Sequence, residues 1–388
     1  MKTSHFILLL LGLSLPIACD EERCSEVTPS ARRTVLVYLA GDNNLSDEVW
    51  EKVDALVFAW QNPQDNLLVY QDTRGERGTP SLMKVVCEAG HSYTEVVKEY
   101  PDANSADPQV FSEVLRDAVS GFPAPSCGLL LFSHGTGWLP SGSYSDPHNY
   151  PAKSTALRSL IDDTGREMEI ADFAAAIPDG QFDFIVLEAC LMASVEVAFE
   201  LRDKTDYLLA SSAEILSPGF TPVYGGILPA LFAQPEAALT EAAACYYTYC
   251  NNLEAPYRSA TVSVIRTDRM KKLAEAMKKV YAVLPDEFTP AVIREIQCFD
   301  RSDDRLFFDL GSLIASVSTT ADTEGRSAAE QAKQALQEAV VYRAATPFFV
   351  NLSVSNHSGL TVYLGQAAYP ALNAAWKKTG WYKCFSAY

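Results

Sequence analysis

The sequence predicts an α/β fold in which a mainly parallel sheet carries helices on both faces. Its 388 residues, 48% of them hydrophobic, suffice for one large domain or two ordinary ones. Apolar strand-like runs alternate with helical patterns through the first half, an order that calls for parallel strands joined by helical crossovers. Two of the runs end on reactive side chains, one reaching His134 and the other Cys190.

The first half supplies strands and helices in alternation. Thr34–Ala40 is rich in β-branched and aromatic residues and stops at 41–44, a Gly-Asp-Asn-Asn turn. Ser46 and Asp47 then open a helix whose apolar positions continue to Trp60 at helical spacing. The elements expected next are a strand (67–71), a hairpin (83–87 and 92–97), a helix (106–119), the strand before His134, a helix (167–177), the strand before Cys190, a helix (194–202) and a strand (207–210).

Helical patterns dominate beyond residue 225. Residues 34–225 are expected to form the core, and 226–388 a C-terminal helical and strand extension of the same unit. Between the two reactive residues, 137–159 has no sustained period, which is typical of a functional or mobile loop. The later elements expected are helices at 235–249, 269–283, 307–317 and 325–342, and strands at 260–266, 348–354 and 360–364.

The charge excludes some classes of partner. With 31 basic and 49 acidic residues the net charge is −18, which argues against nucleic acid and against binding of a basic stretch to an anionic membrane. An acidic surface weakly favours cationic substrates, although solubility alone is the simpler explanation. We expect protein or peptide substrates and a monomer.

Residues 1–18 have the composition of a signal peptide. A positive start precedes the apolar run Phe6–Leu15, which is too short to span a bilayer, and small-residue processing chemistry follows at Ala18. Leu15–Cys19 resembles a bacterial lipobox, although Pro16 stands where Leu is usual. The resemblance implies that Cys19 is lipidated and that 19–33 is an acidic tether.

The same N-terminal segment predicts where the protein is located. The acidic residues 20–22 resemble the cluster that sends some lipoproteins to the outer face of the cell. An ordinary cleaved signal with a coincidental cysteine is the alternative. Both alternatives predict export, and the lipobox predicts the cell envelope or surface, with contact to the membrane only through the anchor.

The nine cysteines indicate no metal site and no disulfide framework, because no C-x-x-C pair is present. Disulfides are compatible with an exported protein, and their pairing stays open. No cofactor is expected. Calcium is not supported by an EF-hand-type loop, and the acidic pairs 162–163 and 303–304 are interpreted as solvated charge.

His134 and Cys190 are the candidate chemistry. A thiol attacks carbonyls as the thiolate, so a catalytic cysteine needs an imidazole nearby to take its proton. In parallel α/β sheets the ligand site lies beyond the carboxyl ends of the strands, where both residues arrive. The backbone amides of Gly135 and Cys190 are expected to stabilise the oxyanion. The alternative is a hydrogen-bonded structural histidine and a core cysteine.

Several segments resemble the clostripain-like family of cysteine peptidases, in order over about residues 33–388. The resemblance implies a caspase-like α/β/α sandwich, with His134 as base, Cys190 as nucleophile and the Gly135 amide as an oxyanion donor. The matching segments are 37–45 (VYLAGDNNL), 133–138 (SHGTGW), 162–165 (DDTG), 188–193 (EACLMA), 210–214 (ASSAE) with 218–219 (PG), and 358–363 (SGLTVY).

The resemblance also implies cleavage after Arg or Lys. In the family an acidic residue two positions before the cysteine helps to hold the basic side chain, and here that residue is Glu188 where Asp is usual. Glu214 is expected as a second acidic wall. The alternatives are a strand-end carboxylate bonded to backbone amides for Glu188 and solvated loop charge for Glu214.

Family members often cut their own chain between the histidine and the cysteine. Lys153, Arg158 and Arg166 lie in or just after the irregular stretch, and exposed loops are where nicking concentrates. We expect Lys153 as the first choice, and an intact chain is the alternative.

Two other functions are compatible with parts of this sequence. In a lipase-like hydrolase, His134–Gly137 would form the oxyanion loop. That fold needs a nucleophile elbow of the G-x-S-x-G type, which this sequence lacks. A non-catalytic surface lipoprotein could use a caspase-like scaffold to bind peptides. The presence of both His134 and Cys190 counts against it, whereas the departure at Glu188 leaves it open.

Overall fold

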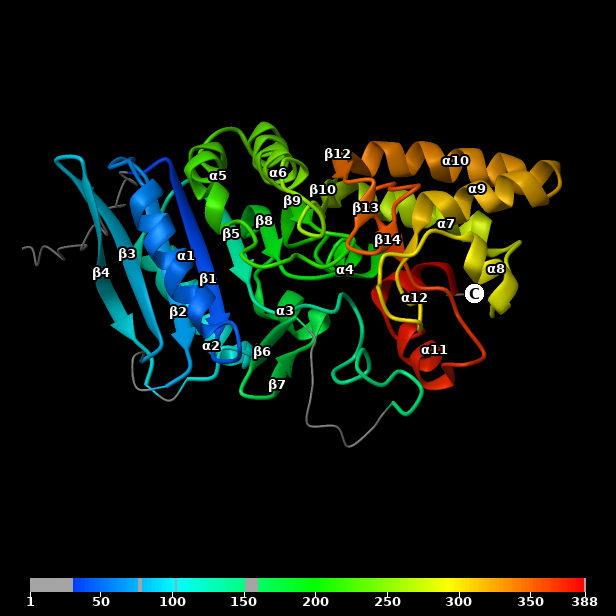
Figure 1. The fold of residues 1–388 in the computed structure, drawn as a ribbon, viewed down its shortest axis with the longest axis horizontal. Coiled ribbons are helices and arrows are strands. Elements are labelled where there is room, and N and C mark those ends of the chain that lie inside the picture. The colour runs from blue at the N-terminus through cyan, green and yellow to red at the C-terminus, as the bar shows by residue number, and fades with distance from the viewer. Residues whose placement is uncertain (1–30, 76–78, 102, 151–159, 387–388) are drawn as a thin grey trace, which may run out of the picture.

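The computed structural model describes residues 31–75, 79–101, 103–150 and 160–386, which build a mixed nine-stranded sheet between two layers of helices (Figure 1). The expected α/β/α sandwich is confirmed. The expected signal peptide with Cys19, most of the tether, and the processing candidates Lys153 and Arg158 lie outside the described residues.

The strands of the central sheet are β1 (Arg33–Gly41), β2 (Asn66–Thr73), β3 (Ser81–Glu88), β4 (His91–Glu99), β5 (Ser126–Phe132), β8 (Phe182–Glu188), β9 (Thr205–Ala210), β10 (Thr261–Arg266) and β12 (Val340–Ala345). Three small ribbons are formed by β6 (Ile161–Asp163) with β7 (Arg166–Met168), β11 (Phe308–Asp309) with β15 (Thr361–Val362), and β13 (Phe348–Phe349) with β14 (Leu352–Ser353).

The α-helices are α1 (Ser46–Ala59), α2 (Pro108–Gly121), α3 (Ile170–Ala176), α4 (Val195–Glu200), α5 (Tyr224–Leu231), α6 (Pro235–Asn251), α7 (Met270–Tyr281), α8 (Pro290–Glu295), α9 (Leu310–Thr320), α10 (Thr323–Ala339), α11 (Pro370–Trp376) and α12 (Gly380–Ser386). Two 3-10 turns, η1 (Thr221–Val223) and η2 (Thr267–Arg269), precede α5 and α7.

The centre of the sheet is parallel and both edges are antiparallel. Its strand order is β12-β10-β9-β8-β5-β1-β2-β3-β4. The five strands from β2 to β9 run parallel, whereas β3 and β4 at one edge and β10 and β12 at the other run antiparallel to their neighbours. The carboxyl ends of the five parallel strands therefore meet along one edge of the sandwich, where such folds bind ligands.

Burial on both faces explains the continuous apolar runs of the central strands. Successive side chains alternate between the faces, so Val35 and Val37 of β1 contact the layer of α1, α5 and α6. Leu36 and Tyr38 contact the opposite layer, which includes α2, α3 and α4. All nine residues of β1 are buried, so neither face of this strand meets solvent.

The C-terminal half completes the same sheet. Residues beyond 260 contribute β10, which pairs with β9, and β12, which pairs with β10 at the edge of the sheet. The helix expected at 325–342 ends at Ala339, and the chain continues as β12 instead. Val340, Val341 and Tyr342 are β-branched or aromatic and favour a strand over a final helical turn.

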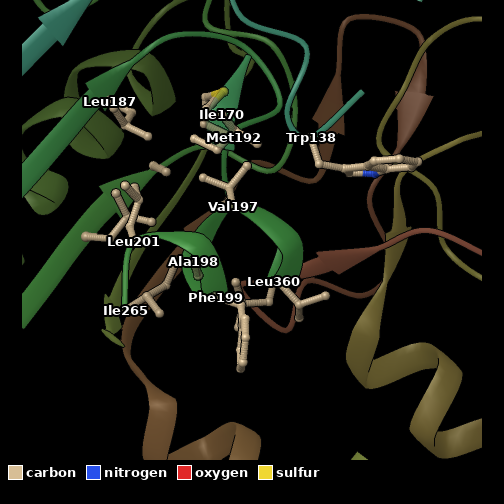
Figure 2. Close-up of a cluster of buried hydrophobic side chains, with 14 of the residues drawn as sticks. Trp138, Ile170, Leu187, Met192, Val197, Ala198, Phe199, Leu201, Ile265 and Leu360 are labelled. Atoms are coloured by element: carbon tan, nitrogen blue, oxygen red, sulfur yellow. The ribbon is translucent and has the colours of Figure 1, made fainter. Parts of the chain in front are cut away.

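An apolar cluster lies under the turn that follows β8. Figure 2 shows Leu187 at the end of β8 and Met192 in that turn, above Val197 and Phe199 of α4. All four are at most 2% exposed. The turn that carries Cys190 therefore rests on a close-packed platform.

The state of the cysteines and the length of the helices bear on the predicted export and membrane contact. The seven cysteines among the described residues are all free thiols. In that part of the chain no helix combines the length and the apolar character needed to cross a bilayer.

Candidate active site

Two neighbouring strands deliver the histidine and the cysteine to the same edge. β5 and β8 pair in parallel, with Phe132 opposite Glu188. His134 and Cys190 each follow that pair by two residues. Because parallel strands keep their register to their ends, the two segments leave the sheet side by side.

Gly135 shows how closely the two segments approach. A Cβ at this position would lie 2.8 Å from the carbonyl oxygen of Cys190 and 2.9 Å from the Cβ of Ala189. Only a residue without a side chain fits this approach. Gly137 adds a second contact, since its φ is +64° and a Cβ there would lie 2.8 Å from the oxygen of Leu191.

A side chain from a third strand end contacts the imidazole. Nε2 of His134 lies 2.8 Å from Oδ1 of Asn44, in the turn after β1. An amide oxygen only accepts hydrogen bonds, so this contact places the proton on Nε2 and makes Nδ1 the basic nitrogen. The sequence predicts only that a strand ends at 41–44, and it does not predict the contact of Asn44 with His134.

The cysteine sits in a fixed, sharp turn. Leu191 has a φ of +63°, which is uncommon for a residue with a side chain. Its amide donates to Ala213 O at 3.0 Å, and the amide of Ala193 donates to Ser211 O at 2.8 Å. These bonds hold the turn against the loop after β9, and that loop returns the contact, because the amide of Ile215 donates to Cys190 Sγ at 3.4 Å.

The Cys190 thiol is half-buried and has an N–H donor aimed at it. The same sulfur lies 3.9 Å from the carbonyl oxygen of Ile215, to which the thiol can donate. The thiol is therefore held by the loop after β9, at the sheet edge where the His134 segment also emerges.

Glu188 does not present a free charge to a substrate. Its side chain is 0% exposed, and Oε1 lies 2.5 Å from Nζ of Lys52, a buried lysine of α1. Phe220 N donates to Oε1 at 2.6 Å, and the Tyr224 hydroxyl donates to Oε2 at 2.8 Å. Of the two interpretations offered by the sequence, the structure favours the strand-end carboxylate with a backbone donor, with an ion pair added.

Glu214 is also paired within the chain. The Nε of Arg301 lies 3.0 Å from each carboxylate oxygen, and the Glu214 side chain is 16% exposed. The ion pair raises the pKa of Arg301, and a negative charge on Cys190 adds to that effect. Arg301 thus lies near the thiol.

The remaining candidates are placed as follows. Arg166 is exposed in β7, part of a hairpin with β6. Asp163 is 2% exposed and accepts a bond from Ser105 N, so the interpretation of this residue as solvated charge is wrong. No group of three or more metal-ligating side chains occurs among the residues that the structure describes.

The model of the clostripain family, peptidase family C11, matches residues 37–385. The chain belongs to the clostripain family of cysteine peptidases. Curated clostripain of Hathewaya histolytica is 22% identical over 217 residues, which cover 48% of this chain and 40% of clostripain. The chain thus matches well under half the length of that relative.

Two solved structures of the clostripain family have similar folds. An inactive zymogen C11 protease from Parabacteroides distasonis is 29% identical, with a TM-score of 0.78 over 92% of this chain and 99% of the other. A secreted C11 cysteine protease from Bacteroides thetaiotaomicron, bound to an irreversible peptide inhibitor, is 27% identical, with a TM-score of 0.75 over 92% and 100%.

Proposed function

We propose that this chain is an exported cysteine endopeptidase that works through His134 and Cys190. The observation that carries the proposal is the close approach of Gly135 to Ala189 and Cys190, which brings the histidine and cysteine segments together at one sheet edge. Family membership supports it.

The proposed reaction uses groups already described. Nδ1 of His134 takes the thiol proton, and Sγ attacks the peptide carbonyl carbon. The backbone amides of Gly135 and Cys190 donate to the oxyanion. The imidazolium then returns the proton to the leaving amine as the C–N bond breaks, and water hydrolyses the thioester to release the acid and the free thiol.

Export and maturation are part of the proposal. The apolar N-terminal run supports export through a signal peptide, with lipidation at Cys19, and the Bacteroides relative is described as secreted. The Parabacteroides relative is described as an inactive zymogen, which supports maturation by cleavage, at Lys153 first or at Arg158. The monomeric state is proposed as well.

Cleavage after Arg or Lys is proposed as well, on the resemblance to the family. Glu188 and Glu214, which were expected to hold the basic side chain, both form ion pairs within the chain, so the proposal does not rest on a free acid.

The test compares wild type with Cys190→Ala and His134→Ala on a mixture-based peptide library and on a denatured protein. We expect hydrolysis by wild type alone, and irreversible labelling of Cys190 by a peptidyl acyloxymethyl ketone. Activity that survives Cys190→Ala would refute the proposal. A wild type that binds peptides but neither cleaves them nor reacts with the ketone would favour the peptide-binding lipoprotein instead.

For self-cleavage, wild type and Cys190→Ala are compared on a denaturing gel after export. Two fragments in wild type and one intact band in the variant are expected. Identical intact bands would contradict maturation in cis.

A further inference from the structure

The turn that carries Cys190 has a backbone conformation that its own residues do not favour. Leu191 has a φ of +63°, a left-handed value that is unfavourable for a residue with a side chain. A conformation of this kind persists only where the surrounding structure imposes it. The bonds made to this turn therefore determine where Sγ of Cys190 lies.

The loop after β9 imposes the conformation through two of its carbonyl groups. Ala213 O accepts from Leu191 N at 3.0 Å, and Ser211 O accepts from Ala193 N at 2.8 Å. The two bonds fall on either side of the residue between Leu191 and Ala193, so they fix the turn at two points. The position of the turn thus depends on the position of Ser211 and Ala213.

One buried hydroxyl holds both of these loop residues. Oγ1 of Thr261, the first residue of β10, accepts from Ala213 N at 2.9 Å and lies 2.8 Å from Ser211 Oγ. Thr261 and Ala213 are 0% exposed, and Ser211 is 1% exposed. Because water does not reach these groups, an amide of Ala213 that lost its acceptor would stay unpaired unless the loop moved.

Other residues of the C-terminal half contact the same loop and turn. Nε2 of His357 lies 3.2 Å from Ser212 Oγ, in the middle of the loop. Thr361 N donates to Ala193 O at 2.8 Å, on the side of the turn that faces away from the loop's carbonyl groups. The C-terminal half therefore takes part in placing the nucleophile, although the reacting groups proposed above all precede residue 226.

We propose that Thr261 is a positioning residue for the nucleophile. Its hydroxyl fixes the loop after β9, the loop imposes the turn, and the turn places Cys190 Sγ relative to His134. The inference rests on the proposed peptidase function. Thr261 is fully buried, so it acts on the reaction only through the loop. A displacement of about 1 Å at a reacting atom can slow the chemical step on the order of 100-fold.

The experiment removes the hydroxyl and keeps the shape. Thr261→Val replaces the hydroxyl with a methyl group, and kcat should fall about 10- to 100-fold while KM changes less than about threefold, because the chemical step rather than peptide binding is affected. Thr261→Ser keeps the hydroxyl and should stay within about threefold of the wild-type kcat. An equal loss in both variants would assign the effect to packing and overturn the proposal.

A threonine at the other end of the same strand gives a matched control. Thr267 directly follows β10, is 0% exposed, and donates its hydroxyl to Thr205 O. Thr267→Val therefore removes a buried hydroxyl of the same kind away from the site, and its kcat should equal that of wild type. Thermal melting reports the loss of stability in both variants. An equal fall of kcat in Thr267→Val and Thr261→Val would overturn the proposal.

A milder variant covers the case in which Thr261→Val does not fold. Ser211→Ala removes one of the two contacts of the Thr261 hydroxyl and leaves the amide of Ala213 with its acceptor. Its kcat should fall about 3- to 10-fold, and its loss should not add to that of Thr261→Val in the double variant, because both act through one contact. A wild-type kcat in Ser211→Ala would overturn the proposal.

Hydrogen exchange separates failure of the proposal from failure of the peptidase function. The exchange rates of the Leu191 and Ala193 amides are measured in wild type, Thr261→Val and Thr267→Val. Both amides should exchange at least about 10-fold faster in Thr261→Val alone, because the loop that protects them is released. That result would support the assignment even if wild type cleaved no peptide, whereas equal rates in the three proteins would overturn it.

Discussion

The imidazole Nε2 of His134 lies 2.8 Å from the side-chain oxygen of Asn44. The contact joins the end of β5 to the turn after β1, its neighbour in the sheet. Because the amide oxygen accepts, the contact favours the tautomer that carries the proton on Nε2 and leaves Nδ1 unprotonated, which is the form that the proposed mechanism needs.

Asn44→Ala should lower kcat/KM by about 10- to 100-fold with little change in stability, because the ring loses its orienting acceptor while the buried core is untouched. The second-order rate of Cys190 alkylation by iodoacetamide should fall and its pH profile should shift. Gln64→Ala, exposed at the opposite end of β2, is the control. Equal rates in both variants would remove Asn44 from the proposed mechanism.

Gly135→Ala should abolish turnover, because the added methyl would lie within 3 Å of the Cys190 oxygen and would push the two segments apart. Gly121→Ala is a matched control, since nothing lies within 4 Å of a Cβ placed there. Peptide hydrolysis and thermal melting measure both variants. Full activity in Gly135→Ala would contradict the close approach.

Lys52→Met should lower the free energy of unfolding by about 3–5 kcal/mol, because it leaves the Glu188 carboxylate buried without its partner. The double variant with Glu188→Gln should regain much of that loss, since no charge remains to be desolvated. Urea denaturation gives both values. A double variant as unstable as the single one would show that packing of the lysine stem matters more than charge.

Asp72, at the end of β2, makes stability depend on pH. Burial raises its pKa to about 7, and the negative charge of Asp163 contributes. Near pH 4 and below, both the folded and unfolded states hold this proton; between pH 4 and 7 only the folded state keeps it. Stability therefore falls as pH rises through this window and levels off above pH 7.

Asp72→Asn should remove that slope. Relative to wild type, the variant should gain on the order of 2 kcal/mol between pH 5 and pH 8.5. Denaturation of both proteins at the two pH values measures the difference, which cancels the contributions of other groups. A difference that is independent of pH would place the Asp72 pKa near its ordinary value.

The strands that deliver the reactive residues could be predicted because burial on both faces leaves an unmistakable apolar run. The runs before His134 and Cys190 are of this kind, and both form adjacent parallel strands. The hairpin predicted at 83–87 and 92–97 is confirmed as the antiparallel pair of β3 and β4.

The partners of the site residues could not be predicted. Asn44 reaches His134 only because β1 pairs with β5, a non-local register that local sequence does not encode. Lys52 looks like an exposed residue of an amphipathic helix, and nothing in the helical pattern shows that its ammonium is buried against β8. For the same reason the sequence does not show that Glu188, expected to hold a substrate side chain, is paired with Lys52.

The antiparallel strands β10 and β12 also determine which pieces of the protein can exist alone. A fragment that stopped near residue 225 would leave β9 paired with β8 on one side only, with the backbone groups that face β10 unpaired. Such borders recruit strands from other molecules and lead to aggregation. If the chain is nicked between His134 and Cys190, the two pieces should therefore remain one particle, because the strand pair of β5 and β8 crosses the break.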